Sequence, residues 1–221
     1  MSLAGPLGIL GGTFDPIHFG HLRMAEEARQ SLGLEAVRLI PAGQPPHREQ
    51  PGTPAARRLK MVELAAADVP MLEVDPAEVL APQASYTILT LERLRAELGP
   101  NRPLVLLLGV DAFLGLTSWH RWRELFAHAH FAVATRPGYS LHEQRMGDAL
   151  AAEFHQRFTP RAQVLSTCPA GLITAFSMTP LAISATAIRA SLAHGGSPRF
   201  LLPDVVLDYI QDHHLYLTDP V

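Results

Sequence analysis

The amino-acid sequence predicts an α/β fold: a doubly wound, mostly parallel sheet with helices on both faces and a small helical part at the C-terminus. Three observations support this prediction. Short apolar runs alternate with segments of helical periodicity along the whole chain. The run 104–108 is apolar throughout, as expected of a strand buried on both faces. Motifs rich in glycine and polar residues follow several of the runs, at the sheet edge where such folds bind ligands.

The first part of the chain opens with a strand–helix–strand unit, the building block of a parallel sheet. Residues 7–10 form a short apolar run that ends in two glycines, which predicts a buried strand followed by a tight loop. Apolar residues then recur near helical spacing over 20–32, and Gly33 ends that helix. Residues 36–40 form the second predicted strand.

A long loop follows at 41–54, rich in proline, glycine and glutamine. Thr53 and Pro54 predict an N-cap and a first helical residue, for a helix that reaches about residue 67. The remaining expected strands are 71–74, 104–108, 131–134 and 173–176, and the remaining expected helices are 87–98, 141–158, 185–193 and 204–213. No internal repeat interrupts the chain, so we expect one domain over 1–221, with 183–221 as a C-terminal helical subdomain.

Composition and charge argue against several classes of protein. No apolar run approaches the roughly 18 residues of a membrane span, and the N-terminus lacks the basic region of a secretory signal, so we expect no membrane association. Cys168 is the single cysteine, which leaves no internal disulfide and fits a cytoplasmic location. The net charge of −3 argues against the binding of long nucleic acids.

Lysine is almost absent, since Lys60 is the sole lysine among 18 basic residues. No Gly-Lys-Ser/Thr step exists, so the chain is not a P-loop NTPase. Any phosphate clamp must therefore use arginine, histidine, backbone N–H groups or a metal ion.

The segment after the first predicted strand carries the strongest functional signal. It runs Gly11-Gly12-Thr13-Phe14-Asp15-Pro16-Ile17-His18-Phe19-Gly20-His21. The glycines let the backbone approach a ligand closely. His18 and His21 are three residues apart at a helix start, where free N–H groups and the helix dipole favour phosphate. Two imidazoles beside such groups predict a polyphosphate site. The dinucleotide fingerprint Gly-x-Gly-x-x-Gly is absent here, which argues against a dehydrogenase.

A second segment of the same kind lies near the C-terminus and runs Ile183-Ser184-Ala185-Thr186-Ala187-Ile188-Arg189. Ser184 is expected to cap the helix that starts there, and the free N–H groups of that helix favour an anion. Arg189 can project a permanent, forked cation toward the same phosphates. Alone, this segment would be interpreted as a capped helix with a surface arginine.

Two more segments follow predicted strands or open predicted helices. After the most apolar run comes Gly109-Val110-Asp111, where a carboxylate suits ribose hydroxyls or a metal-bound water, and then Trp119 and Trp122, which suit a planar ring. For Trp122 a core position is equally compatible with the sequence. The helix at Ser85-Tyr86-Thr87 offers N–H groups that could bind a carboxylate, besides an ordinary cap.

Taken together, these motifs resemble the nucleotidyltransferase superfamily with the His-x-Gly-His signature, and most closely the bacterial nicotinate mononucleotide adenylyltransferases. The resemblance covers 11–189 and implies a Rossmann-like sheet. Ile183–Arg189 is similar to the second signature of the superfamily, Ile-Ser-Ser/Ala-Thr-x-Ile-Arg, rather than to the Lys-Met-Ser-Lys-Ser segment of tRNA synthetases. Pro45-Pro46-His47-Arg48 resembles the Pro-Pro-His-Lys/Arg loop of the family, and Arg136-Pro137-Gly138 matches a further segment.

The resemblance implies a role for each motif residue. His18, His21 and Arg189 are the implied catalytic residues, in contact with ATP phosphates. Trp119 would stack on the nicotinate ring, the backbone at Tyr86 and Thr87 would bind the pyridine carboxylate, and Arg48 would bind the mononucleotide phosphate. The full expected ATP site is Gly11, Gly12, Thr13, Phe14, His18, His21, Gly109, Asp111, Ser184, Thr186 and Arg189. The expected substrate site is Thr13, Arg48, Tyr86, Thr87, Trp119 and Arg136.

The implied reaction joins the AMP part of ATP to nicotinate mononucleotide, with Mg²⁺ carried on the ATP phosphates. The acceptor phosphate is largely a dianion at neutral pH, since its second pKa is about 6, so no general base is required. Three alternatives stay open from the sequence: a nicotinamide mononucleotide adenylyltransferase, a phosphopantetheine adenylyltransferase, and a nucleotide-binding regulator without catalysis.

Overall fold

A computed structural model describes residues 5–45, 52–136, 141 and 145–217 of the chain. Its six strands form one parallel sheet in the order β3-β2-β1-β4-β5-β6, which confirms the predicted fold class. The strands are β1 (Leu7–Gly12), β2 (Ala36–Pro41), β3 (Leu72–Val74), β4 (Leu104–Gly109), β5 (His130–Thr135) and β6 (Ile173–Ser177).

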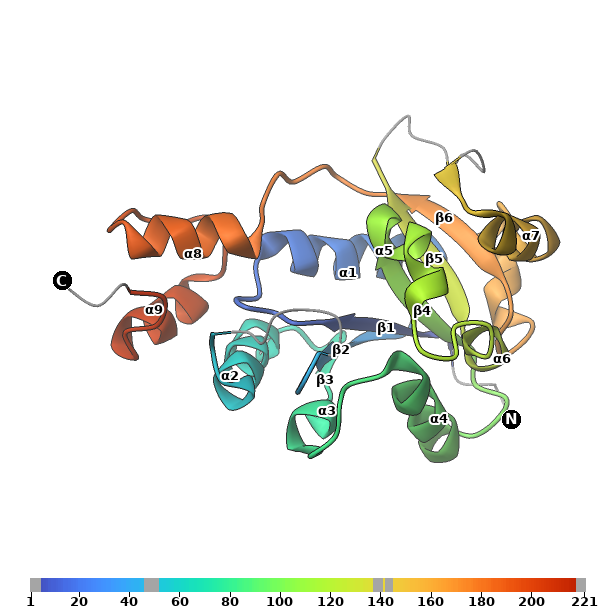
Figure 1. The fold of residues 1–221 in the computed structure, drawn as a ribbon, viewed down its shortest axis with the longest axis horizontal. Helices are drawn as coiled ribbons and strands as arrows, with labels where there is room; N and C mark the ends of the chain where they lie inside the picture. The colour runs from blue at the N-terminus through green and yellow to red at the C-terminus, as the bar shows by residue number, and fades with distance from the viewer. Residues whose placement is uncertain (1–4, 46–51, 137–140, 142–144, 218–221) are drawn as a thin grey trace.

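The helices lie on both sides of this sheet (Figure 1). The longer ones are α1 (Phe19–Leu32), α2 (Ala55–Ala66), α4 (Thr87–Leu98), α7 (Asp148–Arg157), α8 (Ala185–Ala193) and α9 (Asp204–Asp212). The shorter ones are α3 (Ala77–Leu80), α5 (Val110–Leu114), α6 (Leu125–His128) and the 3₁₀ turns η1 (Leu116–Ser118) and η3 (Ala162–Ser166). No helix in the described ranges is long and apolar enough to cross a membrane.

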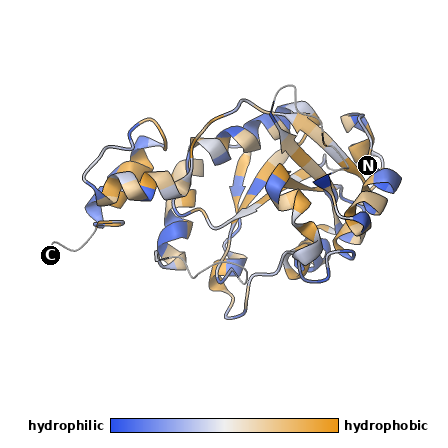
Figure 2. Ribbon diagram, turned by 45° about the horizontal axis from the view of Figure 1, so that its top comes forward, coloured by the Kyte–Doolittle hydropathy of each residue, from blue (hydrophilic) through white to orange (hydrophobic). Residues whose placement is uncertain are grey.

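Alternation along each strand divides the core into two layers. In β4, Val105 and Leu107 pack toward α1, α2, α8 and α9, whereas Leu104, Leu106 and Leu108 pack toward α4 to α7. Successive side chains of a strand point to opposite faces, so a strand covered on both sides must be apolar at every position. Figure 2 shows strands that are mostly apolar and helices in which polar and apolar residues are mixed.

Two predicted helix starts are wrong. α2 begins at Ala55 with Pro54 as the N-cap, and Thr53 does not cap it; the carbonyl of Thr53 instead accepts a hydrogen bond from Arg58 Nε at 3.2 Å. α7 begins at Asp148 rather than at residue 141, with Gly147 as an extended N-cap. Glycine disfavours a helix interior, so the helix starts after it.

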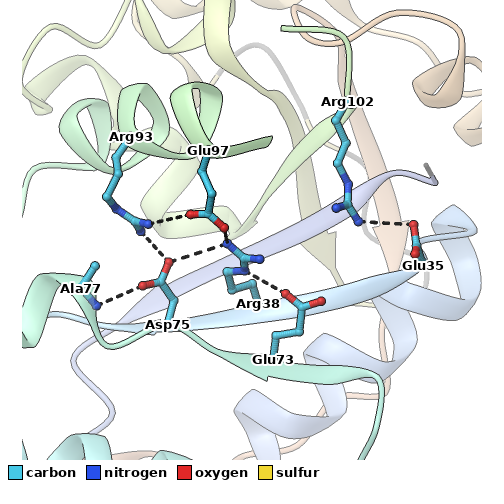
Figure 3. A network of polar contacts seen from close by, with 8 residues as sticks. All are labelled: Glu35, Arg38, Glu73, Asp75, Ala77, Arg93, Glu97 and Arg102. Atoms are coloured by element: carbon cyan, nitrogen blue, oxygen red, sulfur yellow. Dashed lines mark hydrogen bonds and ion pairs between the residues drawn. The ribbon is translucent and has the colours of Figure 1, made fainter. Parts of the chain in front are cut away.

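An ion network fastens α4 to the sheet (Figure 3). Arg38 of β2 donates to Glu73 of β3 at 2.8 Å and to Glu97 of α4 at 2.9 Å. Arg93, also on α4, donates to Asp75 at 2.5 Å, and Asp75 in turn accepts the N–H of Ala77 at 3.0 Å. The network therefore links one helix to two strands and to the start of α3.

Candidate active site

The strand order reverses between β1 and β4, and a cleft of about 580 Å³ opens near the carboxyl ends of these two strands. A parallel sheet binds its ligands at such a reversal. This main cleft is lined by predicted site residues from four separate motif segments: Gly11, Gly12, Thr13, Phe14, His21, Tyr86, Thr87, Asp111, Trp119, Thr186 and Arg189. The volume lies within the range of roughly 300 to 1,000 Å³ usual for small-molecule sites.

The turn after β1 brings the backbone up to this cleft. A Cβ placed on Gly12 would lie 3.1 Å from the Phe14 ring, so any larger residue would push that ring aside by a few tenths of an ångström. Phe14 is buried and has a φ of 49°, a conformation uncommon for a bulky residue. The Phe14 ring meets the His21 ring edge-on at 5.0 Å, which fixes the position of that histidine.

The two motif histidines lie against each other at the start of α1. His18 is the N-cap residue, and its ring stacks on the ring of His21 with centroids 3.7 Å apart. His21 Nδ1 accepts the backbone N–H of His18 at 3.3 Å, a contact that favours the tautomer with the ring proton on Nε2. Of the two motif histidines, His21 lines the main cleft, whereas His18 is buried behind the His21 ring and only 6% exposed.

Burial sets the charge of His18. It lowers the pKa of His18 to about 4, because the surroundings disfavour the imidazolium ion. His18 is thus neutral at pH 7 in the free protein. A Cβ on Gly20 would come within 3.0 Å of the His18 ring, which explains why glycine separates the two histidines.

The start of α8 faces the same cleft. Ser184 Oγ caps the helix as predicted, by accepting the N–H of Ala187 at 3.1 Å, while Thr186 and Arg189 line the cleft. Arg189 Nη1 donates to the backbone carbonyl of Asp15 at 2.7 Å. α1 and α8 therefore present two helix N-termini and one guanidinium to one cleft, an arrangement that favours polyphosphate.

A second cleft of about 400 Å³, the side cleft, lies at the carboxyl ends of β4, β5 and β6. Gly109 and Arg136 line this side cleft and not the main one, and Asp111 lines both. The structure thus separates Arg136 from the group around Tyr86 and Trp119. Asp111 marks the junction through which one extended ligand could occupy both clefts.

The start of α4 forms another wall of the main cleft. Ser85 Oγ accepts the N–H groups of Gly43 at 3.0 Å and of Gln44 at 3.3 Å, which ties the loop after β2 to this helix. Tyr86 is the N-cap residue, and its ring lies 4.7 Å from that of His120. The first N–H groups of a helix have no acceptor inside it, so α4 directs donors toward this wall.

Arg58 is a residue that the motif analysis missed. It is 1% exposed and donates to the carbonyls of Thr13 at 2.6 Å and Gly43 at 3.1 Å, besides that of Thr53. The turn after β1 and the loop after β2 are thereby held together. In the sequence Arg58 looks like any helical arginine, since its partners Thr13 and Gly43 lie 45 and 15 residues earlier in the chain. Arg48 falls outside the described residues.

The described residues contain no group of three histidine, cysteine, aspartate or glutamate side chains that could hold a metal ion. Asp111 lines the main cleft, and Asp15, which also lines it, has its carboxylate hydrogen-bonded by Tyr216 Oη at 2.6 Å. Magnesium is commonly bound by one or two carboxylates together with the phosphates of a substrate, and this donor set fits that arrangement.

Comparisons with known proteins agree with this geometry. Residues 9–191 match the model of the cytidylyltransferase-like family. The chain is 56% identical to the probable nicotinate-nucleotide adenylyltransferase of Dechloromonas aromatica over 214 residues, which covers 97% of this chain and 99% of the relative. It is 50% identical to the protein of the same name from Pseudomonas aeruginosa strain UCBPP-PA14, covering 95% and 96%.

Solved structures show the same fold. The nicotinic acid mononucleotide adenylyltransferase of Plasmodium falciparum, complexed with NaAD, superposes with a TM-score of 0.71 at 17% identity, over 96% of this chain and 97% of that one. A putative nicotinate-nucleotide adenylyltransferase from Vibrio parahaemolyticus gives a TM-score of 0.60 at 15% identity, covering 96% and 95%. From the family model and the full-length relatives, the chain belongs to the cytidylyltransferase-like family and, within it, to the nicotinate-nucleotide adenylyltransferases.

Proposed function

We propose that this protein transfers the adenylyl group of ATP to nicotinate mononucleotide, giving nicotinate adenine dinucleotide and pyrophosphate in NAD biosynthesis. One observation carries the assignment to this site: His21 and Arg189, beside two helix N-termini, share the main cleft with Trp119 and the start of α4. The first group suits a triphosphate and the second a planar ring with a carboxylate. We assign the reaction to the cytoplasm, in line with the single cysteine.

ATP would occupy both clefts. The adenosine part fits the side cleft, where Asp111 can accept from ribose hydroxyls and Gly109 leaves the backbone open. The phosphates then pass Asp111 into the main cleft, toward His21 and Arg189. In this arrangement Arg136 is closer to the ATP side than to the acceptor, although the resemblance placed it with the acceptor.

The acceptor would bind at the other wall of the main cleft. Trp119 offers a ring face to the pyridine, and the first N–H groups of α4, at Tyr86 and Thr87, offer donors to its carboxylate. Thr13, on the turn directly after β1, also lines the main cleft. The mononucleotide phosphate is assigned to Arg48.

The proposed preference for nicotinate depends on the charges near the start of α4. Glu78 shares a hollow of about 110 Å³ beneath the main cleft with Ser85, Thr87 and Trp119. Burial raises the pKa of Glu78, and Thr90 Oγ1 donates to the Glu78 carboxyl at 2.5 Å. A carboxyl group whose charge is disfavoured repels a substrate carboxylate less than an ionised one would.

The chemistry requires alignment and charge stabilisation. The acceptor phosphate, a dianion at neutral pH, attacks the α-phosphorus of ATP in line, and pyrophosphate leaves from the opposite side. His21 can donate a hydrogen bond to the leaving group, and Arg189 can pair with it. His18 is neutral and stacks on the ring of His21, so it supports the orientation of that ring. Mg²⁺ on the phosphates, beside Asp111, would neutralise further charge.

The experiment that tests this function measures pyrophosphate release from Mg·ATP with nicotinate mononucleotide, nicotinamide mononucleotide and phosphopantetheine side by side. We expect the largest kcat/KM for the nicotinate nucleotide. A larger value for either other acceptor would keep the chemistry and overturn the substrate. Absence of release with all three, while ATP still binds, would favour the nucleotide-binding regulator.

A first prediction concerns the motif histidines. His18→Ala and His21→Ala should each lower kcat by roughly 100-fold or more. His21→Ala removes a hydrogen-bond donor to the charge of the transition state, and His18→Ala removes the ring that stacks against His21. His194→Ala is the matched control, since His194 is exposed at the far end of α8. Thermal unfolding should show that all three variants fold. Near-normal turnover of His21→Ala would remove that residue from the mechanism.

A further inference from the structure

The C-terminal segment reaches back to the turn that carries the histidine motif. Tyr216 Oη donates to Asp15 Oδ1 at 2.6 Å, although the two residues are 201 positions apart in the sequence. Asp15 is 6% exposed, and burial together with Asp15 raises the pKa of Tyr216, so the hydroxyl keeps its proton and remains a donor. None of the motifs discussed above includes Tyr216.

The backbone at both ends of this contact is held away from its preferred conformation. Tyr216 has a φ of 65° and Phe14, next to Asp15, has a φ of 49°. For bulky side chains such angles cost free energy and persist where surrounding contacts fix them. Leu215 N–H donates to the carbonyl of Ile210 at 3.0 Å, which ends α9 and sets the direction of the chain toward the turn.

Asp15 lies between this tyrosine and the guanidinium that faces the cleft. Arg189 Nη1 donates to the backbone carbonyl of Asp15 at 2.7 Å, but the Asp15 carboxylate oxygen Oδ2 is 4.0 Å from the same nitrogen. The carboxylate therefore makes its short hydrogen bond with Tyr216 and only a long contact with Arg189. A close bidentate pair would instead occupy the donors that a phosphate needs.

We propose that Tyr216 is a positioning residue of the ATP site: by holding the Asp15 carboxylate, it keeps Arg189 available to the triphosphate. The inference rests on the function proposed above and extends it to the turn that follows α9. Without the hydroxyl, Asp15 can rotate toward Arg189 and form the closer ion pair. The guanidinium would then have to leave a carboxylate before it could bind ATP.

The test compares Tyr216→Phe with wild type in the full chain. This variant keeps the ring and removes one hydroxyl. We expect the KM for ATP to rise about tenfold, the size of one hydrogen bond to a charged group, with the KM for nicotinate mononucleotide unchanged. Titration calorimetry with Mg·ATP alone should show a similar loss of affinity. Tyr209→Phe is the matched control, since Tyr209 accepts from Arg57 at 3.0 Å, away from Asp15.

A double-mutant cycle with Asp15→Asn decides whether the effect passes through Asp15. In the Asp15→Asn background the competing charge is gone, so Tyr216→Phe should no longer change the KM for ATP. An equal change in both backgrounds, or equal increases in both KM values, would overturn the proposal. The proposed function fails separately, if wild type itself releases no pyrophosphate with nicotinate mononucleotide.

Discussion

At the scale of single residues, the two tryptophans separate recognition from packing. Trp119 lines both the main cleft and the hollow beneath it. Trp122 is 9% exposed and belongs to the core, with Arg123 4.5 Å above its ring and Phe126 at its edge. The sequence left both possibilities open for Trp122, because spacing along a chain does not say which ring meets solvent.

The paired substitutions test this division. Trp119→Ala should raise the KM for nicotinate mononucleotide by roughly 5- to 150-fold, since stacking on an aromatic ring contributes roughly 1 to 3 kcal/mol, and should leave the KM for ATP nearly unchanged. Trp122→Ala should lower the free energy of unfolding by about 3 kcal/mol through the cavity it leaves. Steady-state kinetics and urea unfolding measure the two effects. An unchanged KM in Trp119→Ala would contradict stacking.

At the scale of elements, the first turn of α4 lies at the main cleft, and ion pairs hold the rest of this helix. Its first residue Thr87 lines the main cleft, while Arg93 and Glu97 join the ion network with Arg38 and Asp75 (Figure 3). Asp75 is 7% exposed and forms an ion pair with Arg93. Removal of the Asp75 charge therefore leaves the Arg93 guanidinium without its closest partner. The position of the proposed carboxylate site therefore depends on contacts made away from it.

Asp75→Asn should lower the free energy of unfolding by about 2 kcal/mol, as expected for the loss of hydrogen bonds to a charged group. The KM for nicotinate mononucleotide should rise more than the KM for ATP, because the start of α4 serves the acceptor. Glu153→Gln is the control, since its ion pair with Arg157 at 2.7 Å lies on α7. Equal KM changes for both substrates would show that α4 acts only through overall stability.

At the scale of the whole molecule, two buried histidines make stability depend on pH. Burial lowers the pKa of His18 to about 4 and lowers the pKa of His130 as well. His130 is fully buried, accepts the N–H of Leu172 at 3.1 Å through Nδ1, and faces the carbonyl of Cys168 at 2.9 Å through Nε2. A proton added at Nδ1 would break the first of these contacts.

The direction of the pH effect follows from linkage. Both pKa values are lower in the folded state than in the unfolded one, where histidine titrates near 6.5. The unfolded state thus binds more protons than the folded state below about pH 6.5. Stability is lost as the pH falls from there, down to about 4 in the case of His18, by at most about 1.4 kcal/mol per pH unit for each histidine. Urea unfolding at pH 7.5, 6 and 5 measures this loss. In His130→Asn the slope should be smaller; an unchanged slope would exclude His130 as a cause.

The sequence by itself determined the strands, the parallel sheet and the motifs at the strand ends. These features depend on local periodicity and on residues close together in the chain, as at His18 and His21 or at Ser184 and Arg189. The same reasoning misplaced the starts of α2 and α7, since caps depend on backbone geometry that composition does not fix.

Only the tertiary structure decided which of these residues share a cleft, and which others support them. Arg58 binds carbonyls from three segments, and Tyr216 meets Asp15 across 201 positions. His18 lies behind His21 rather than in the main cleft, and Arg136 lines the side cleft rather than the main one. Such contacts form when the sheet and its helices pack, so their partners are chosen by folding in space and leave no pattern along the chain.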